Sequence, residues 1–181
     1  MHRQLLLTDL KKYVTSAFIT PEQYPVVTRF IDFVTAHEEC FHRSNSGHVT
    51  SGAWIVNPQK THALLTHHKK FNMWCQLGGH NDGDHRCNVV ALKEAHEESG
   101  IHNLVFLHKD IFDIDIHPIP GTCGYHYDVR YLLQAPADDA YTVSNESHDL
   151  AWVSFEEIHR FTSEASVLRM NEKALRFLRN T

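Results

Sequence analysis

The chain has 181 residues, of which 42% are hydrophobic, and a formal net charge of −5 at pH 7. This length fits one domain with a short extension, and the apolar content is enough to bury a core. The charged residues are of mixed sign and form no basic stripe, which argues against nonspecific binding of DNA or RNA. A small nucleotide that arrives with its own metal ion is not excluded.

No targeting or membrane-spanning pattern is visible in the sequence. There is no apolar run of about eighteen residues, and the first residues lack the organisation of a signal peptide. We therefore expect a soluble, cytoplasmic protein with no membrane partner. The four cysteines have no Cys-x-x-Cys spacing and are expected to be reduced thiols. They are Cys40, Cys75, Cys87 and Cys123.

Residues 1–40 are predicted to form an N-terminal helical extension, and residues 41–181 the main domain. Apolar residues recur at helical spacing before and after Pro21, which breaks the pattern. We expect two helices that pack against the later domain. Their apolar residues are Leu5, Leu6, Leu10 and Tyr13 in the first, and Val26, Val27, Phe30, Ile31, Phe33 and Val34 in the second.

Strand-like segments follow the two helices. Residues 48–57 are rich in Val, Thr, Ile and Trp, and the apolar residues 63–65 follow a turn-like Asn-Pro pair, which predicts an antiparallel hairpin. Three later segments have the same strand-like composition: 105–116, 125–133 and 150–155. Ser163 is predicted to cap a closing helix. The residues of this helix that face the core are Val167, Leu168, Ala174, Leu175 and Leu178.

Three acidic residues crowd one face of a helix predicted to follow the glycine pair at 78–79. Glu94, Glu97 and Glu98 stand at i, i+3 and i+4, so their carboxylates lie on the same side. Such crowding costs stability unless a cation lies among them, and Mg²⁺ or Mn²⁺ takes oxygen ligands and bridges phosphate oxygens. Lys93 lies beside the cluster and can orient one carboxylate. The alternative is an ordinary acidic, solvated helix face.

This segment resembles the signature of the Nudix hydrolases: Gly, five residues, Glu, seven residues, Arg-Glu, an apolar residue, any residue, Glu-Glu, any residue, Gly and an apolar residue. Aligned on Gly79, its later part falls on Lys93, Glu94, Ala95, Glu97, Glu98, Gly100 and Ile101. His85 stands where the first Glu is expected, and Lys93 replaces an arginine, with loss of its planar fork. Gly100 fits a left-handed helix end. The resemblance implies an α/β fold, an α/β/α sandwich with a mixed central sheet that here carries the N-terminal helices.

Polar and apolar residues alternate along residues 111–117 and again along 125–131. The polar ones are Asp113, Asp115 and His117 in the first segment, and His126, Asp128 and Arg130 in the second. A strand would send each set to one side. If the two segments pair as a hairpin, the polar sides coincide in a surface suited to a metal or an anionic ligand. A sheet with a wet outer face explains the same pattern, and both interpretations stay open.

A second resemblance concerns the histidines. Isopentenyl-diphosphate isomerases, distant relatives within the Nudix fold, hold a metal with histidines and an acidic pair. Two of their motifs are similar to His48-Val49-Thr50-Ser51 and Gly78-Gly79-His80. The resemblance implies a second site, for Zn²⁺, Mn²⁺ or Fe²⁺, and its candidate ligands are His48, His80, His126 and Asp128, with His42 upstream. The cysteine of the isomerases would fall on Gly78, so the isomerase reaction is poorly supported.

The Nudix resemblance implies hydrolysis of a pyrophosphate bond in a nucleoside diphosphate linked to another moiety, or in a related diphosphate. Mg²⁺ or Mn²⁺ held by Glu94, Glu97 and Glu98 would neutralise phosphate oxygens and lower the pKa of a bound water. A carboxylate of this catalytic triad, or a residue from a later loop, would act as general base. Candidate substrate contacts are Gly79, Arg43 and Arg130, with Lys69 and Lys70.

Two alternative functions stay open at this point. One is an isomerase-like or otherwise divergent enzyme that uses the histidine-rich site. The other is a sensor that binds nucleotide derivatives without turnover, and His85 in place of the first glutamate of the signature is the only feature that favours it. The sequence identifies neither the substrate nor the oligomeric state, and a homodimer is among the states left open.

Overall fold

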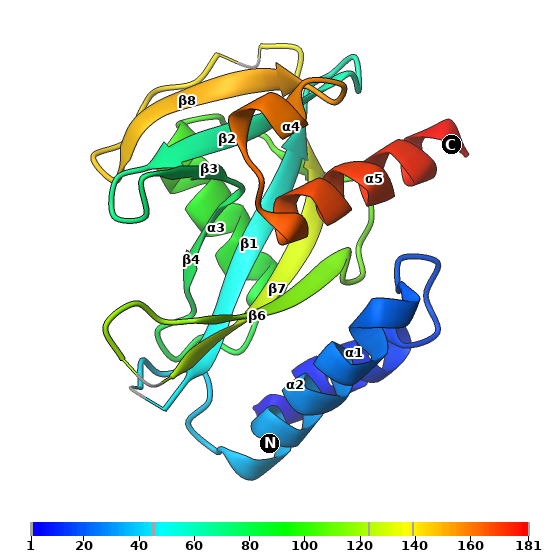
Figure 1. The fold of residues 1–181 in the computed structure, drawn as a ribbon, viewed down its shortest axis with the longest axis vertical. Helices are drawn as coiled ribbons and strands as arrows, with labels where there is room; N and C mark the ends of the chain where they lie inside the picture. The colour runs from blue at the N-terminus through cyan, green and yellow to red at the C-terminus, as the bar shows by residue number, and fades with distance from the viewer. Residues whose placement is uncertain (1, 45, 123, 139, 181) are drawn as a thin grey trace.

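In the computed structural model, which describes residues 2–44, 46–122, 124–138 and 140–180, an eight-stranded mixed sheet forms the middle layer of the fold (Figure 1). Its strands are β1 (His48–Val56), β2 (His62–His68), β3 (Met73–Cys75), β4 (Leu77–His80), β5 (Val105–Phe106), β6 (Asp113–Pro118), β7 (Tyr125–Gln134) and β8 (Ser147–Ser154). The helices are α1 (Arg3–Tyr13), the short 3-10 turn η1 (Pro21–Gln23), α2 (Tyr24–Ala36), α3 (Cys87–Ser99), α4 (Ile158–Phe161) and α5 (Ala165–Arg179). They cover both faces of the sheet, so the predicted α/β/α sandwich is confirmed. No helix in the described part of the chain is both long and apolar enough to cross a membrane.

β1 and β7 run parallel at the centre of the sheet, with His48 opposite His126. β2 and β4 pair antiparallel with β1, β3 and β8 pair with β2, and β5 and β6 pair with β7. The predicted hairpin of β1 and β2 is confirmed, with Ile55 opposite Leu64. β1 is therefore the strand around which the polar residues of the neighbouring strands gather.

The N-terminal extension forms two helices as predicted, and Pro21 begins the short turn between them. The ring of Phe33 in α2 stacks on Tyr127 of β7, with the ring centroids 3.7 Å apart. Leu5, expected on the packed face, is instead 49% exposed. The buried residues of the two helices belong to the same hydrophobic cluster as strand residues and α5; they are Leu6, Leu10, Tyr13, Val27, Phe30, Phe33 and Val34. The extension and the later domain therefore share one core.

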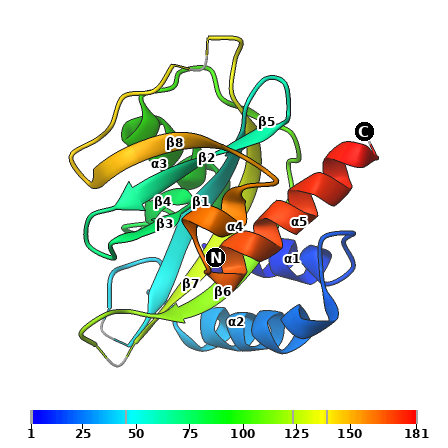
Figure 2. The same ribbon diagram turned by 45° about the horizontal axis from the view of Figure 1, so that its top comes forward.

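α3 covers one face of the sheet and α5 crosses the other (Figure 2). α3 ends as predicted at Gly100, whose φ of 69° is left-handed. The cap predicted at Ser163 is wrong, because α5 begins at Ala165 with Glu164 at its N-cap and no side-chain cap hydrogen bond. The N–H of Glu164 instead donates to Thr162 Oγ1 at 3.2 Å. This local turn delays the start of the helix beyond Ser163.

The strand predicted over residues 105–116 is interrupted. Its two ends form β5 and β6, and both pair with β7, but residues 108–111 leave the ladder. Asp110 in this excursion pairs with Lys12 of α1 at 2.7 Å. The apolar content of the segment predicted one continuous strand, whereas its central polar residues turn out of the sheet toward the N-terminal helix.

The described cysteines are free thiols, in agreement with the expectation from their spacing: Cys40, Cys75 and Cys87. Burial is the main cause that raises the pKa of Cys40 to about 11 and that of Cys87 to about 12. Both therefore remain protonated near neutral pH. Cys123 lies outside the described residues.

Candidate active site

A cavity of about 780 Å³ lies where β4, α3, the β2–β3 turn and the start of α5 meet. This volume is in the usual range for small-molecule sites. The cavity is lined by residues of both predicted metal sites, Glu94 and Glu97 of α3 together with His80 of β4 and His126 of β7. The two predicted sites therefore open into one pocket.

Two of the acidic residues of α3, Glu94 and Glu98, contact the glycine turn that precedes the helix. Gly79 packs so closely against Glu94 that a Cβ at residue 79 would overlap the carboxylate. Lys93 Nζ lies 3.2 Å from Glu94 Oε1 and 3.0 Å from Glu97 Oε2, so this lysine bridges two members of the cluster. The helix geometry and the glycine together place two carboxylates at the cavity wall.

Glu98, the third acidic residue, is only 4% exposed and accepts a hydrogen bond from the N–H of Gly78 at 3.1 Å. Burial raises its pKa to about 8, opposed by that hydrogen bond and assisted by the nearby charge of Glu94. Burial also raises the pKa of Glu94. A cation placed among these oxygens would favour the ionised forms, so the donor set fits a hard divalent ion such as Mg²⁺ or Mn²⁺.

Three histidines come together because β1 pairs with β4 on one edge and with β7 on the other. His48, His80 and His126 each offer a ring nitrogen, and these atoms lie within 4.8 Å of one another. His48 and His126 are 4% and 8% exposed, and Nε2 of each is buried without a hydrogen-bond partner. An unpaired buried nitrogen is costly, so a ligand that engages these atoms would stabilise the folded protein.

The protonation state of the three histidines favours the binding of a cation. Burial, followed by neighbouring positive and imidazole groups, lowers the pKa of His126 to about 3 and that of His80 to about 4. Burial also lowers the pKa of His48. The rings are therefore neutral near pH 7, and neutral imidazole nitrogens bind Zn²⁺, Mn²⁺ or Fe²⁺.

Asp128 and His42, the other predicted ligands of this site, lie outside the three-histidine cluster. Asp128 lines the cavity but already accepts hydrogen bonds from Thr50 Oγ1 at 3.0 Å, Arg130 Nε at 2.6 Å and Gln76 Nε2 at 3.3 Å. The side chain of His42 is 61% exposed on the loop before β1. Direct bonds from either residue to an ion stay predictions.

The two arginines predicted to bind substrate both line the cavity, and each is already paired. Arg43 forms two hydrogen bonds with Asp82, at 2.6 and 2.8 Å, and its side chain remains 60% exposed. Arg130 is 2% exposed and contacts Asp128 and Asp113. Arg43 is therefore the more accessible of the two predicted phosphate contacts, and Arg130 is held in the wall.

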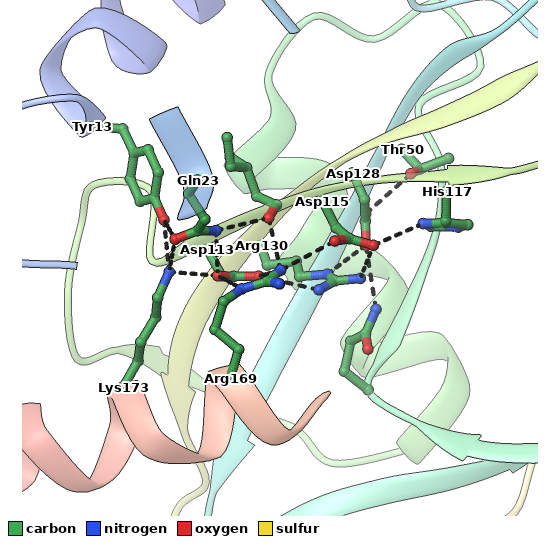
Figure 3. A network of polar contacts seen from close by, with 12 residues as sticks. Tyr13, Gln23, Thr50, Asp113, Asp115, His117, Asp128, Arg130, Arg169 and Lys173 are labelled. Carbon is green, nitrogen blue, oxygen red and sulfur yellow. Dashed lines mark hydrogen bonds and ion pairs between the residues drawn. The ribbon is translucent and has the colours of Figure 1, made fainter. Parts of the chain in front are cut away.

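A buried network of charges extends from the cavity to the N-terminal helices (Figure 3). Asp113 is fully buried and contacts Arg130 at 3.1 Å, Arg169 at 2.9 Å and Lys173 at 2.5 Å. The predicted coincidence of the polar sides of β6 and β7 is confirmed by their register, with Asp113 opposite Arg130. Because α5 covers these residues, the interpretation as a wet outer face is wrong for this pair.

Sequence reasoning missed the part that α5 plays in this network. Lys173 Nζ donates to Tyr13 Oη at 2.7 Å and to Gln23 Oε1 at 2.6 Å, as well as contacting Asp113. The available signal was its position on the apolar stripe of the helix, where a solvated lysine would not be expected. Glu146 and Glu164, which line the cavity from two distant loops, carry no local signal.

His85, which replaces the first glutamate of the signature, lies toward the N-terminal helices. Its ring centroid is 5.1 Å from that of His2 at the N-cap of α1. The residues that line the cavity come instead from the glycine turn before it and from α3 after it. The departure at residue 85 therefore leaves the acidic cluster in place.

Comparison with known proteins identifies the family. A model of the NUDIX domain matches residues 47–174, well over half of the chain, and the chain belongs to the Nudix family. No curated protein matches it.

Three solved structures illustrate the fold. A C. elegans Ap4A hydrolase in a binary complex has a TM-score of 0.66 and 20% identity, over 74% of this chain and 98% of that one. A NUDIX-family hydrolase from Clostridium perfringens has a TM-score of 0.60 and 23% identity, over 72% and 97%. The NUDIX domain of Shewanella oneidensis NrtR, complexed with ADP ribose, has a TM-score of 0.56 and 14% identity, over 81% and 97%. At these identities the likeness shows the fold alone.

Proposed function

We propose that this protein is a metal-dependent pyrophosphohydrolase that acts on a small nucleoside diphosphate linked to another moiety, or on a related diphosphate. The observation that carries the proposal is the placement of Glu94 against Gly79, with Glu97 beside it, at the wall of a ligand-sized cavity. The exposed side chain of Arg43 and the adjacent lysines of the β2–β3 turn line the same cavity, where they can meet phosphate oxygens.

Mg²⁺ or Mn²⁺, when bound, supplies charge neutralisation at the diphosphate and an acidified water. Glu94 and Glu97 would hold the ion, with Lys93 orienting both carboxylates. Glu98, the third predicted ligand, would fix the glycine turn through the N–H of Gly78, and its direct bond to the ion stays a prediction. Carboxylates suit the binding of the ion because Mg²⁺ prefers oxygen ligands. They suit the contact with the glycine turn because a carboxylate oxygen accepts a hydrogen bond from a backbone N–H.

The general base is proposed to come from Glu146 or from the α3 carboxylates. Glu146 lines the cavity, and its charge helps to raise the pKa of Glu94. Its loop is attached to the β2–β3 turn, because Lys69 Nζ donates to the carbonyl of Asn145 at 2.8 Å and the Lys69 N–H to that of Glu146 at 3.0 Å. This attachment keeps the acidic side chain of Glu146 at the wall of the cavity.

The test is a screen of dinucleotides, nucleotide sugars and nucleoside triphosphates for release of phosphate or nucleotide with Mg²⁺. The parent should hydrolyse at least one class, and Glu97→Gln should lower that rate about a hundredfold or more. Glu172→Gln, on the exposed side of α5, is the matched control and should keep the parent rate. Equal rates for parent and Glu97→Gln would contradict the assignment, and binding without hydrolysis would support a sensor instead.

A second candidate function rests on the unpartnered Nε2 atoms of His48 and His126. We propose that these two rings and His80 bind a transition metal in the same cavity, as in a divergent metalloenzyme that uses a histidine site. Metal analysis of protein purified without chelator or histidine tag tests it. His80→Ala should lose the bound metal, and an unchanged metal content would contradict the site.

The boundaries 1–40 and 41–181 are likewise proposed as helical extension and catalytic domain, supported by a family match that begins at residue 47.

The free thiols support the cytoplasmic, reducing compartment expected from the sequence. A small diphosphate is the proposed partner of the site.

A further inference from the structure

We propose that Asp115 and His117 are positioning residues that fix the tautomer of His126, so that its buried Nε2 is kept as a bare lone pair. The proposal rests on the histidine metal site given above as a candidate function. It concerns the state of the protein before any ion arrives, and it can therefore be tested separately from metal binding.

The three residues form a continuous chain of contacts across the β6–β7 hairpin. His117 lies opposite His126 in the register. Asp115 Oδ2 is 3.3 Å from His117 Nδ1, and His117 Nε2 is 3.2 Å from His126 Nδ1. At the end of this chain, His126 Nε2 is buried without a hydrogen-bond partner and belongs to the three-histidine cluster.

The carboxylate sets the direction of every hydrogen bond in this chain. An ionised carboxylate only accepts, so His117 must donate from Nδ1–H to Asp115. The Nε2 atom of a neutral His117 then carries a lone pair and accepts from Nδ1–H of His126. The remaining nitrogen of a neutral His126, Nε2, must be the bare one.

The far end of the chain is anchored so that the carboxylate stays ionised and in place. Arg169 Nη2 of α5 lies 3.1 Å from Asp115 Oδ1, and Arg130 Nη2 lies 3.7 Å from Asp115 Oδ2 (Figure 3). Burial acts to raise the pKa of Asp115, but the hydrogen bond from His117 and the two guanidinium charges outweigh it and hold that pKa well below its usual range.

The arrangement matches the general use of carboxylate–histidine pairs behind metal ligands. Such outer groups fix the orientation and tautomer of a ligating imidazole, and their loss lowers metal affinity about 10- to 100-fold. His48 is oriented differently, because its Nδ1 contacts the backbone of Ser44, at 3.1 Å from the carbonyl and 3.2 Å from the N–H. Of His48 and His126, only His126 therefore has its tautomer set by other side chains. We call this chain of hydrogen bonds, from Asp115 through His117 to His126, the relay.

The experiment compares ring nitrogens by long-range ¹H–¹⁵N NMR of metal-free protein labelled at histidine, with His126 assigned by its loss in His126→Ala. In the parent, His126 should carry its proton on Nδ1 and show a bare Nε2. In His117→Phe, which removes the acceptor, His126 should populate the other tautomer. His117→Gln places an amide oxygen near the former Nε2 and should restore the parent state. His159→Phe, at an exposed position of α4, should change nothing at His126.

Titration with Zn²⁺ provides the second readout. His117→Phe should bind Zn²⁺ about 10- to 100-fold more weakly than the parent, whereas His117→Gln should stay close to the parent. A parent whose His126 is protonated at Nε2 overturns the relay, and that spectrum needs no variant to fold. A bare Nε2 in a parent that binds no Zn²⁺ supports the relay and refutes the metal site, so the two failures are distinguishable.

Discussion

Lys173 of α5 and Asp113 of β6 form an ion pair at 2.5 Å in which both side chains are fully buried. The same ammonium group donates to Tyr13 and Gln23 of the N-terminal segment, and the same carboxylate contacts Arg169. One charged pair thereby connects the first helix, the last helix and an edge strand behind the cavity. Through Asp113, this network positions Arg130 in the wall of the cavity, although its residues lie outside the segment that resembles the Nudix signature.

Breaking that pair should destabilise the protein strongly. Lys173→Met leaves a buried carboxylate with one cation fewer, and we expect the free energy of unfolding to fall by about 3–5 kcal/mol in urea denaturation. Lys12→Met is the matched control, because its ion pair with Asp110 is exposed and should be worth less than about 1 kcal/mol. A similar small loss for both variants would show that the buried network contributes little.

The N-terminal helices should behave as part of the core of the domain. Phe33→Ala removes the ring stacked on Tyr127 and should cost about 3–5 kcal/mol of unfolding free energy. Leu5→Ala, at an exposed position of α1, should cost far less. Two separate unfolding transitions in the parent, of which Phe33→Ala shifts only one, would contradict a shared core.

Glu98 should make stability depend on pH when divalent ions are removed with a chelator. Its pKa is raised from 4.5 to about 8 in the folded protein, so the folded state binds this proton more tightly than the unfolded chain. The resulting stabilisation is complete below pH 4.5 and is lost as the pH rises through about 8. Urea denaturation at several pH values should show this decline in the parent and a shallower one in Glu98→Gln. Identical slopes would mean that Glu98 ionises normally.

Gly79→Ala should disturb the acidic cluster without unfolding the chain. The added Cβ would overlap the Glu94 carboxylate, which is the movable end of a side chain and would turn away. We expect about a hundredfold loss of Mg²⁺-dependent hydrolysis, since small displacements at a reacting centre are costly. A melting temperature close to that of the parent would confirm that the fold is kept, and an unchanged rate would show that Glu94 tolerates the shift.

Local patterns in the sequence predicted much of the fold and the two clusters at the cavity. The spacing of Glu94, Glu97 and Glu98 defines a helix face by itself, and the alternation around Asp113 and Arg130 anticipated the register of β6 and β7. Both depend on periodicity within a short segment, which the sequence displays directly.

Contacts between distant segments had no such signal. Lys173 meets Tyr13 and Asp113 only because α1, α5 and β6 converge in space, and charged residues on a helix are normally solvated. The interruption of the strand predicted at 105–116 was missed for a related reason, since the excursion of residues 108–111 toward Lys12 depends on a tertiary contact. Ser163 is not the cap because the hydroxyl of the preceding residue, Thr162, accepts the hydrogen bond from the N–H of Glu164.

The most direct test of the central claim is a crystal structure with Mn²⁺ and a slowly hydrolysed diphosphate, in which anomalous scattering locates the ion. We expect an ion at bonding distance from carboxylate oxygens of Glu94 and Glu97, with the diphosphate in the cavity beside Gly79. Carboxylates turned away from the cavity, with no ion between them and the diphosphate, would contradict it.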